Sequence, residues 1–218
     1  MRKTRQTIKL LVACAVLTAC AGLPLVNEIY PADKEDTLFD SLKIEVVYMK
    51  DCAPSATALI FLKNRIVSNA ICKRDGVEIV VQPEISLPPR MVWTIRDFQR
   101  SEEKHRKLPH IPGKSRKMNL FVLYLKDGMY FDARGIRNLG GLTYGESSTV
   151  LWWDHSQSRE GGVLLHEFGH TLNASGFPRD PAHKAHCPNN SCVMYYTVPS
   201  FWSDFCVACR KQLKQLRK

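Results

Sequence analysis

The chain has 218 residues and a formal net charge of +10 at pH 7. This length is enough for one domain with a real core, and no internal repeat points to an array of units. Four cations lie within the first nine residues, so 10 − 4 leaves +6 for the rest of the chain. Much of this excess falls in segments 105–117 and 210–218. We interpret both segments as solvated surface, with attraction to anionic lipid as the alternative.

Residues 1–19 have the pattern of a bacterial lipoprotein signal peptide. A cationic head without acidic residues precedes the apolar stretch 10–19, which is shorter than the about 20 residues that span a membrane. The stretch ends in Leu-Thr-Ala-Cys20, which resembles the lipobox, where cleavage leaves a lipidated cysteine first. An uncleaved anchor or a short buried helix is the alternative.

Lipidation of Cys20 would place the protein in the bacterial cell envelope, attached to the membrane by its N-terminal lipid. Ala21 is not the aspartate that retains lipoproteins at the inner membrane, so we expect the outer membrane in a cell with two. Nucleic acid is a poor partner for an envelope protein. We expect a linker over 20–40, and then one domain over 41–218.

Hydrophobic periodicity predicts alternating strands and helices in this domain. Segment 43–49 alternates and is rich in β-branched residues, so we expect a strand. In 55–71, apolar residues recur every four positions, which predicts a helix with one buried stripe, made of Ala58, Leu62, Ile66 and Ala70. The remaining predictions are strands at 77–82, 118–125, 140–146 and 148–153 and helices at 94–106 and 158–173, the last with Asp154 and Gln157 as a capping pair.

The order of these elements predicts an α+β fold with a mixed, twisted sheet of about five strands. A strand–helix–strand unit makes the first strand pair parallel. The short links after residue 125 favour antiparallel additions at an edge. We expect the helix at 158–173 to carry the active site, followed by a small cysteine-rich part at 186–218.

The sequence His166-Glu167-Phe168-Gly169-His170 predicts a zinc site. On a helix, histidines four positions apart share one face and can bind one zinc ion, while Glu167 lies beside that face. Zinc lowers the pKa of a bound water to about 7, and the glutamate can accept the proton as the water attacks a carbonyl group. Chance gives only about 0.01 such motifs in this chain, and a purely structural zinc would not require the glutamate, so the motif favours catalysis.

A third protein ligand must come from another part of the chain. No glutamate follows Glu167, which excludes the thermolysin type of site, where a downstream glutamate binds the zinc. Histidine suits a site with two imidazoles better than a carboxylate does. The remaining candidates are His183 and His186, with Asp180 and Asp204 as weaker ones.

Beyond this motif, residues 166–212 resemble the archaemetzincins, whose pattern is H-E-x-x-H-x-x-G-x-x-H-C-x4-C-x-M followed by C-x-x-C. The resemblance implies a metzincin-like fold, and the predicted strand and helix order agrees with it. It implies the following site: His166, His170 and His186 as ligands of a catalytic zinc, Glu167 as general base, and Met194 as the Met-turn beneath the zinc. In some related metzincins a tyrosine at the position of Tyr196 reaches the zinc or the oxyanion; a packed aromatic side chain is the alternative.

The resemblance also implies a second, structural zinc, held by Cys187, Cys192, Cys206 and Cys209. Disulfides are the alternative, because the envelope is oxidising. Cys52 and Cys72 flank the helix at 55–71, whose length of about 25 Å exceeds the span of a disulfide. We therefore predict that these two cysteines do not pair with each other.

Three features depart from the family pattern. Asn173 replaces the family's glycine, and twelve residues, 174–185, precede His186 instead of two. The bend after the helix needs a left-handed residue, which Asn173 or Gly176 can supply. His183 lies on the same loop but has no neighbouring cysteine, so we favour His186. In addition, only eleven residues separate Met194 from Cys206, fewer than the family usually has.

The sequence therefore predicts a membrane-anchored, zinc-dependent peptidase that acts as a monomer on peptides or proteins. The alternative is a non-catalytic zinc lipoprotein that uses the same fold for binding or metal handling. Metzincins bind an extended peptide antiparallel to an exposed edge strand. Segment 140–146 is our candidate for that strand.

Overall fold

A computed structural model describes residues 37–88, 90–111, 115–126, 129–132, 135–137, 139–153, 157–174, 185–197 and 203–216. These residues belong to one compact unit, Ala32–Lys218. The predicted signal peptide, the lipidation site Cys20 and the capping residue Asp154 lie outside the described residues. Within the described part of the chain, no helix is long and apolar enough to cross a membrane.

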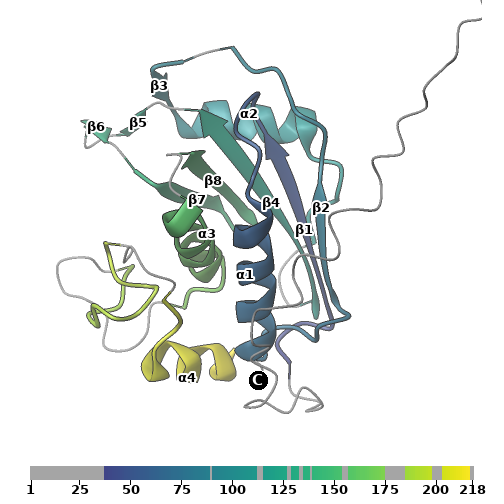
Figure 1. Ribbon diagram of the computed structural model, residues 1–218, viewed down its shortest axis with the longest axis vertical. Helices are drawn as coiled ribbons and strands as arrows, with labels where there is room; N and C mark the ends of the chain where they lie inside the picture. The colour runs from purple at the N-terminus through teal and green to yellow at the C-terminus, as the bar shows by residue number, and fades with distance from the viewer. Residues whose placement is uncertain are drawn as a thin grey trace, which may run out of the picture. The chain divides into compact units, whose positions relative to one another are not determined.

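The fold is built on a five-stranded sheet with the order β2-β1-β4-β8-β7 (Figure 1). The strands are β1 (Ser41–Tyr48), β2 (Val77–Val81), β4 (Lys117–Lys126), β7 (Gly141–Gly145) and β8 (Ser148–Trp153). All neighbours in this sheet pair in parallel except β7, which pairs antiparallel with β8. This confirms the expected mixed sheet with one antiparallel edge.

The prediction of antiparallel additions after residue 125 is right for β7 and wrong for β8, which pairs parallel with β4. The reason is a second, three-stranded sheet with the order β3-β5-β6, which the sequence pattern did not predict. Its strands are β3 (Val92–Trp93), β5 (Met129–Asp132) and β6 (Gly135–Arg137). After β4 the chain leaves the main sheet through β5 and β6 and returns as β7. The β7–β8 hairpin then gives β8 the direction of β4.

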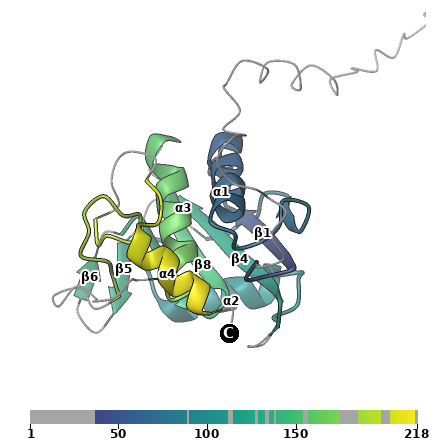
Figure 2. The same cartoon turned by 90° about the horizontal axis from the view of Figure 1, so that it is seen from below.

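Helices cover both faces of the main sheet. α1 (Ala56–Ser68) and α3 (Gln157–Thr171) lie on one face, and α2 (Ile95–His105) lies on the other (Figures 1 and 2). Burial from both sides explains why eight consecutive residues of β4, from Met118 to Leu125, are buried. The core of the fold therefore has two layers, one on each side of β4.

Helix α1 follows the predicted pattern up to its last turn. Ala58, Leu62 and Ile66 are buried, and the hydroxyl of Ser55 caps the helix by accepting a hydrogen bond from the backbone N–H of Ala58 at 3.1 Å. The prediction is wrong for Ala70, which lies beyond the helix with a φ of 52°. This left-handed residue closes a Schellman motif, in which the N–H of the next residue bonds back to the carbonyl of Ile66 at 3.0 Å.

The interpretation of segment 105–117 as solvated surface needs correction at its start. The Arg106 side chain is only 11% exposed and forms an ion pair with Glu102. The backbone N–H of Lys107 donates to the carboxylate of Glu45 at 2.8 Å, and Glu45 is fully buried in β1. The start of this basic segment therefore holds a helix end against the sheet and satisfies a buried carboxylate.

Candidate metal centres

Helix α3 carries the His166-Glu167-Phe168-Gly169-His170 motif. Leu164 and Phe168 are fully buried and fix the helix in the core. His166 is 4% exposed and Glu167 5%, whereas His170 is partly exposed. The motif therefore lies at the boundary between the core and an accessible surface.

The bend at the C-terminal end of α3 is made by Asn173. Asn173 has a φ of 52°, in the left-handed region. Its N–H donates to the carbonyl of His170, and the N–H of Ala174 donates to the carbonyl of Gly169, each at 2.9 Å. These two bonds define a Schellman motif with Asn173 in the position usually taken by glycine. Asn173 therefore supplies the bend, while Gly176 lies outside the described residues.

Three histidines converge beside α3. The Nε2 atoms of His166 and His170 lie 3.0 Å apart, and the ligand atoms of His166, His170 and His186 all lie within 4.8 Å of one another. Two nitrogens bound tetrahedrally to one zinc ion would lie about 3.3 Å apart. The structure thus brings the third histidine of the archaemetzincin pattern to the other two.

Asp204, another candidate for the third ligand, does not join this group. Its carboxylate instead accepts hydrogen bonds from Arg65 in α1 at 3.1 Å and from Asn69, the C-cap of α1, at 2.8 Å. His183 and Asp180 lie outside the described residues.

The two histidines of α3 have the chemistry of metal ligands. Nδ1 of His166 lies 2.6 Å from the backbone carbonyl of Val193. Because a carbonyl only accepts, Nδ1 carries the proton and Nε2 is left with its lone pair. Burial lowers the pKa of His166 to about 4 and that of His170 to about 3. Both rings are therefore neutral near pH 7, which is the form that binds a metal.

Strand β7 holds the carboxyl group of Glu167. The hydroxyl of Thr143 lies 2.9 Å from Glu167 Oε2. Gly141 leaves the space that the side chain needs, since a Cβ there would lie 2.7 Å from Glu167 Cγ. Burial raises the pKa of Glu167 to about 8, and a cation bound nearby would lower it.

Thr143 and Gly141 were not among the residues predicted for the site. The period-two alternation of 140–146 places both on one face of the strand. The sequence does not tell which face of the strand meets α3, so this alternation alone did not single them out.

Met194 lies directly against the metal helix. It is fully buried, and a Cβ on Gly169 would lie 2.2 Å from the Met194 sulfur. The methionine side chain therefore fills the space left by the glycine between the two histidines of α3. Tyr196 is 45% exposed and its ring lies 4.4 Å from that of Tyr195. Tyr196 is therefore not an aromatic residue of the core.

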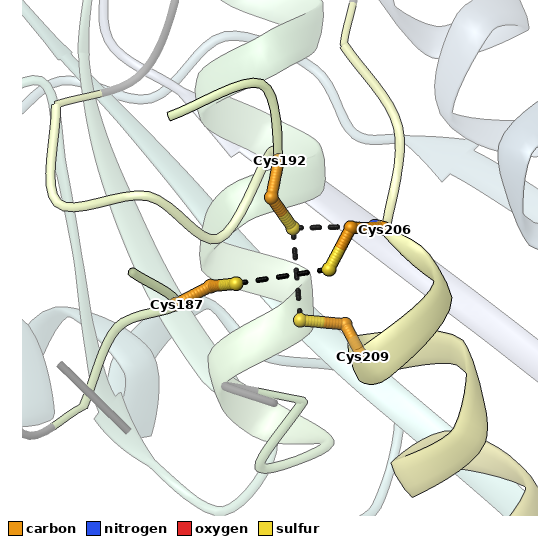
Figure 3. A group of neighbouring side chains, drawn as sticks. All are labelled: Cys187, Cys192, Cys206 and Cys209. Atoms are coloured by element: carbon orange, nitrogen blue, oxygen red, sulfur yellow. Dashed lines mark hydrogen bonds between the residues drawn. The ribbon is translucent and has the colours of Figure 1, made fainter. Parts of the chain in front are cut away.

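The four cysteines of the C-terminal part converge in a second group (Figure 3). The sulfurs of Cys187 and Cys206 are 3.7 Å apart, and those of Cys192 and Cys209 are 3.6 Å apart. Sulfurs bound tetrahedrally to one zinc ion would lie about 3.8 Å apart, whereas disulfide sulfurs lie about 2.05 Å apart. The geometry fits a metal better than disulfides, and the short spacing between Met194 and Cys206 does not prevent the four from meeting.

Two further observations bear on the cysteines. Hydrogen bonding with Cys209 lowers the pKa of Cys192 below the usual value of a thiol, which favours the thiolate form that binds a metal. Cys52 and Cys72 are both buried and are not joined by a disulfide, as predicted.

Backbone hydrogen bonds connect the two groups of ligands. His186 directly precedes Cys187, whose N–H donates to the carbonyl of Met194 at 2.8 Å. Val193, which orients His166 through its carbonyl, follows Cys192 and donates its N–H to the carbonyl of Asp204 at 3.0 Å. Segment 186–194 therefore carries His186 and the carbonyl that orients His166, and it also carries Cys187 and Cys192 of the cysteine group.

Known proteins resemble this chain in fold but not detectably in sequence. No family profile and no curated protein matches the chain in sequence. The fold is similar to the crystal structure of archaemetzincin from Methanopyrus kandleri, with a TM-score of 0.54 and 16% identity, covering 81% of this chain and 95% of that one. It also matches metalloproteinase-II from Bacteroides fragilis, with a TM-score of 0.49 and 11% identity, covering 84% of this chain and 55% of that one. The fold of the chain is therefore similar to that of archaemetzincin.

Proposed function

We propose that the protein is a zinc-dependent peptidase that hydrolyses peptide bonds, with Glu167 as the general base. The observation that carries this proposal is the pairing of a buried glutamate with three converging histidines on an archaemetzincin-like fold. Binding or storage of a metal requires the histidines but not Glu167. The carboxylate therefore favours the catalytic reading over metal handling.

The donor set fits zinc. Neutral imidazoles are preferred zinc ligands, and catalytic sites usually combine three protein ligands with one open position. His166, His170 and His186 would hold the ion, and in the described residues their group contains no fourth protein ligand. When bound, zinc would polarise the scissile carbonyl and activate a water molecule.

The residues around the three histidines would orient the ligands and transfer protons. The Val193 carbonyl orients His166, and Met194 supports the helix between the two histidines of α3. Glu167 would accept the proton of the attacking water and return it to the leaving amine. Tyr196, exposed beside Tyr195, is our candidate for a contact to the zinc or the oxyanion.

We place the substrate along β7. This strand is the end of the main sheet, paired with β8 at one edge, so its other edge can add an extended peptide in antiparallel orientation. The same strand contacts Glu167 through Thr143. A peptide bound there would therefore lie close to the base.

We further propose a second, structural zinc in the cysteine group, which would stabilise the C-terminal part of the fold. The sulfur separations of 3.6–3.7 Å support metal binding over disulfides. Helix α4 (Val207–Gln215) contributes Cys209, and Cys206 lies at its N-cap.

The choice of third ligand is tested by metal analysis of two variants. We expect the purified protein to bind two zinc ions and to cleave peptides in a mixed library, as detected by mass spectrometry. His186→Ala should lose one zinc ion and all cleavage, because two imidazoles do not hold a catalytic zinc firmly. His183→Ala is the matched control from the same loop and should keep both.

Two results would contradict these assignments. Loss of the zinc ion in His183→Ala, with retention in His186→Ala, would move the third ligand to His183. A protein that binds zinc in full and cleaves no peptide would instead favour the non-catalytic role.

We also propose that the mature protein is a monomer, anchored by lipid on Cys20 to the bacterial envelope and preferentially to the outer membrane. Cys20→Ala should abolish incorporation of labelled fatty acid and shift the protein from the membrane fraction to the soluble one. The control is Cys14→Ala, which changes a cysteine of the expected signal peptide and should leave labelling intact. Equal labelling of wild type and Cys20→Ala would rule out this anchor.

A further inference from the structure

Strand β7 contacts the side chain of Glu167 at two positions. Gly141 and Thr143 are two residues apart, so they share one face of the strand, and both meet Glu167 on α3. The Thr143 hydroxyl lies 2.9 Å from Glu167 Oε2 and 2.8 Å from the backbone oxygen of Glu167. At Gly141, a Cβ would lie 2.7 Å from Glu167 Cγ and 2.9 Å from Oε1.

These contacts define where the carboxyl group can lie. Oε2 shares the hydroxyl hydrogen of Thr143 with the backbone oxygen of Glu167, and Oε1 occupies space that is free only because residue 141 has no side chain. Glu167 is 5% exposed, so a lost hydrogen bond would not readily be replaced by water. The position of the carboxyl group therefore depends on these two residues of β7.

The strand itself is supported from the opposite face of the sheet. Thr143 pairs with Thr149 and Gly145 with Ser148, so Tyr144 is an extra residue in a β-bulge. Bulges often lie next to active sites, where they direct a side chain. The Tyr144 ring packs 5.5 Å from that of Phe98 on α2. This contact fixes the bulge next to Thr143.

We propose that Thr143 and Gly141 are positioning residues, which hold the carboxyl group of Glu167 in the place required for proton transfer. This proposal rests on the proposed peptidase function. Because β7 is also the strand along which we place the substrate, one element would set the position of both the peptide and the base. A misplacement of about 1 Å in such a site can lower the rate about 100-fold.

The first test removes the hydroxyl group. Thr143→Val keeps the branched shape and the strand preference but cannot donate to Glu167. We expect kcat to fall by about 10- to 100-fold, with KM and zinc content close to those of the wild type. Thr143→Ser restores the hydroxyl and should recover most of kcat, which a role in packing alone would not predict.

The second test fills the space at residue 141. Gly141→Ala should displace the Glu167 side chain, lower kcat to a similar extent and leave the zinc content unchanged. Gly140→Ala is the matched control, because a Cβ there approaches only Val163, at 3.4 Å. In the crystal structure of Gly140→Ala, the Glu167 carboxyl group should keep its wild-type position. Crystal structures of Thr143→Val and Gly141→Ala should show the Glu167 carboxyl group displaced and the three histidines in place.

Failure of the proposal and failure of the proposed function give different results. Wild-type kcat in zinc-loaded Thr143→Val or Gly141→Ala would overturn the positioning role while the peptidase function stands. Equal losses in Thr143→Val and Thr143→Ser would do the same. A wild-type protein that cleaves no peptide would overturn the function itself, and the role of Thr143 with it.

Discussion

Replacing Glu167 with glutamine is expected to reduce peptide cleavage by at least about 100-fold while both metal groups keep their zinc, because general-base catalysis contributes about 10²- to 10⁴-fold. Glutamine has the shape of glutamate and its amide oxygen can still accept the Thr143 hydroxyl. It cannot accept a proton from water. The measurement is kcat/KM on a cleaved peptide, together with zinc content.

The matched control for this change lies on the same helix. Glu160 is also buried, and its carboxylate accepts a hydrogen bond from the backbone N–H of Ser55 at 3.0 Å. Glu160→Gln can keep that bond, and its turnover should remain close to that of the wild type. If Glu167→Gln cleaves peptides as fast as the wild type, Glu167 is not the base.

Replacing Cys206 and Cys209 together with serine is expected to remove one zinc ion and to destabilise the fold. The free energy of binding a structural zinc adds directly to folding stability. A loss of about 3 kcal/mol would lower Tm by about 6–12 °C in a domain of this size. We also expect weaker zinc binding by the histidines, because Val193 and His186 lie next to cysteines of the group.

Cys52→Ser is the matched control for the double variant. Cys52 is buried outside the group, and its sulfur donates to the carbonyl of Lys50 at 3.4 Å, a bond that serine can make. This variant should keep both zinc ions and a Tm near that of the wild type. Native mass spectrometry that finds disulfides among the four cysteines, with no zinc, would contradict the structural zinc.

Sequence patterns predicted the parts of the fold that depend on local periodicity. The apolar run at 118–125 indicated a strand buried on both faces, and the spacing of His166 and His170 places both on one face of any helix. The approach of His186 depended on the archaemetzincin resemblance, because twelve residues without a helical or strand pattern separate it from Asn173.

The features that sequence did not predict depend on contacts between distant segments. Strands β3, β5 and β6 have only two to four residues each, which is too short for a clear period. Arg106 looked like one of many surface cations, since its charge does not reveal that the fold buries it. Ala70 ends its helix in a left-handed conformation, and the usual marker of such an ending is glycine. At the end of α3, the sequence pattern left two candidates for the bend, Asn173 and Gly176.

The contact between Gly169 and Met194 has a consequence for how such sites evolve. A side chain at position 169 would collide with the Met194 sulfur at 2.2 Å and approach the Phe205 ring at 3.0 Å. The two middle positions of the H-E-x-x-H motif are therefore not equally free in this chain, because the second of them is restricted by a residue 25 positions later. In an alignment of relatives we expect residues 169 and 194 to covary, with alanine or serine at 169 accompanied by a smaller side chain at 194.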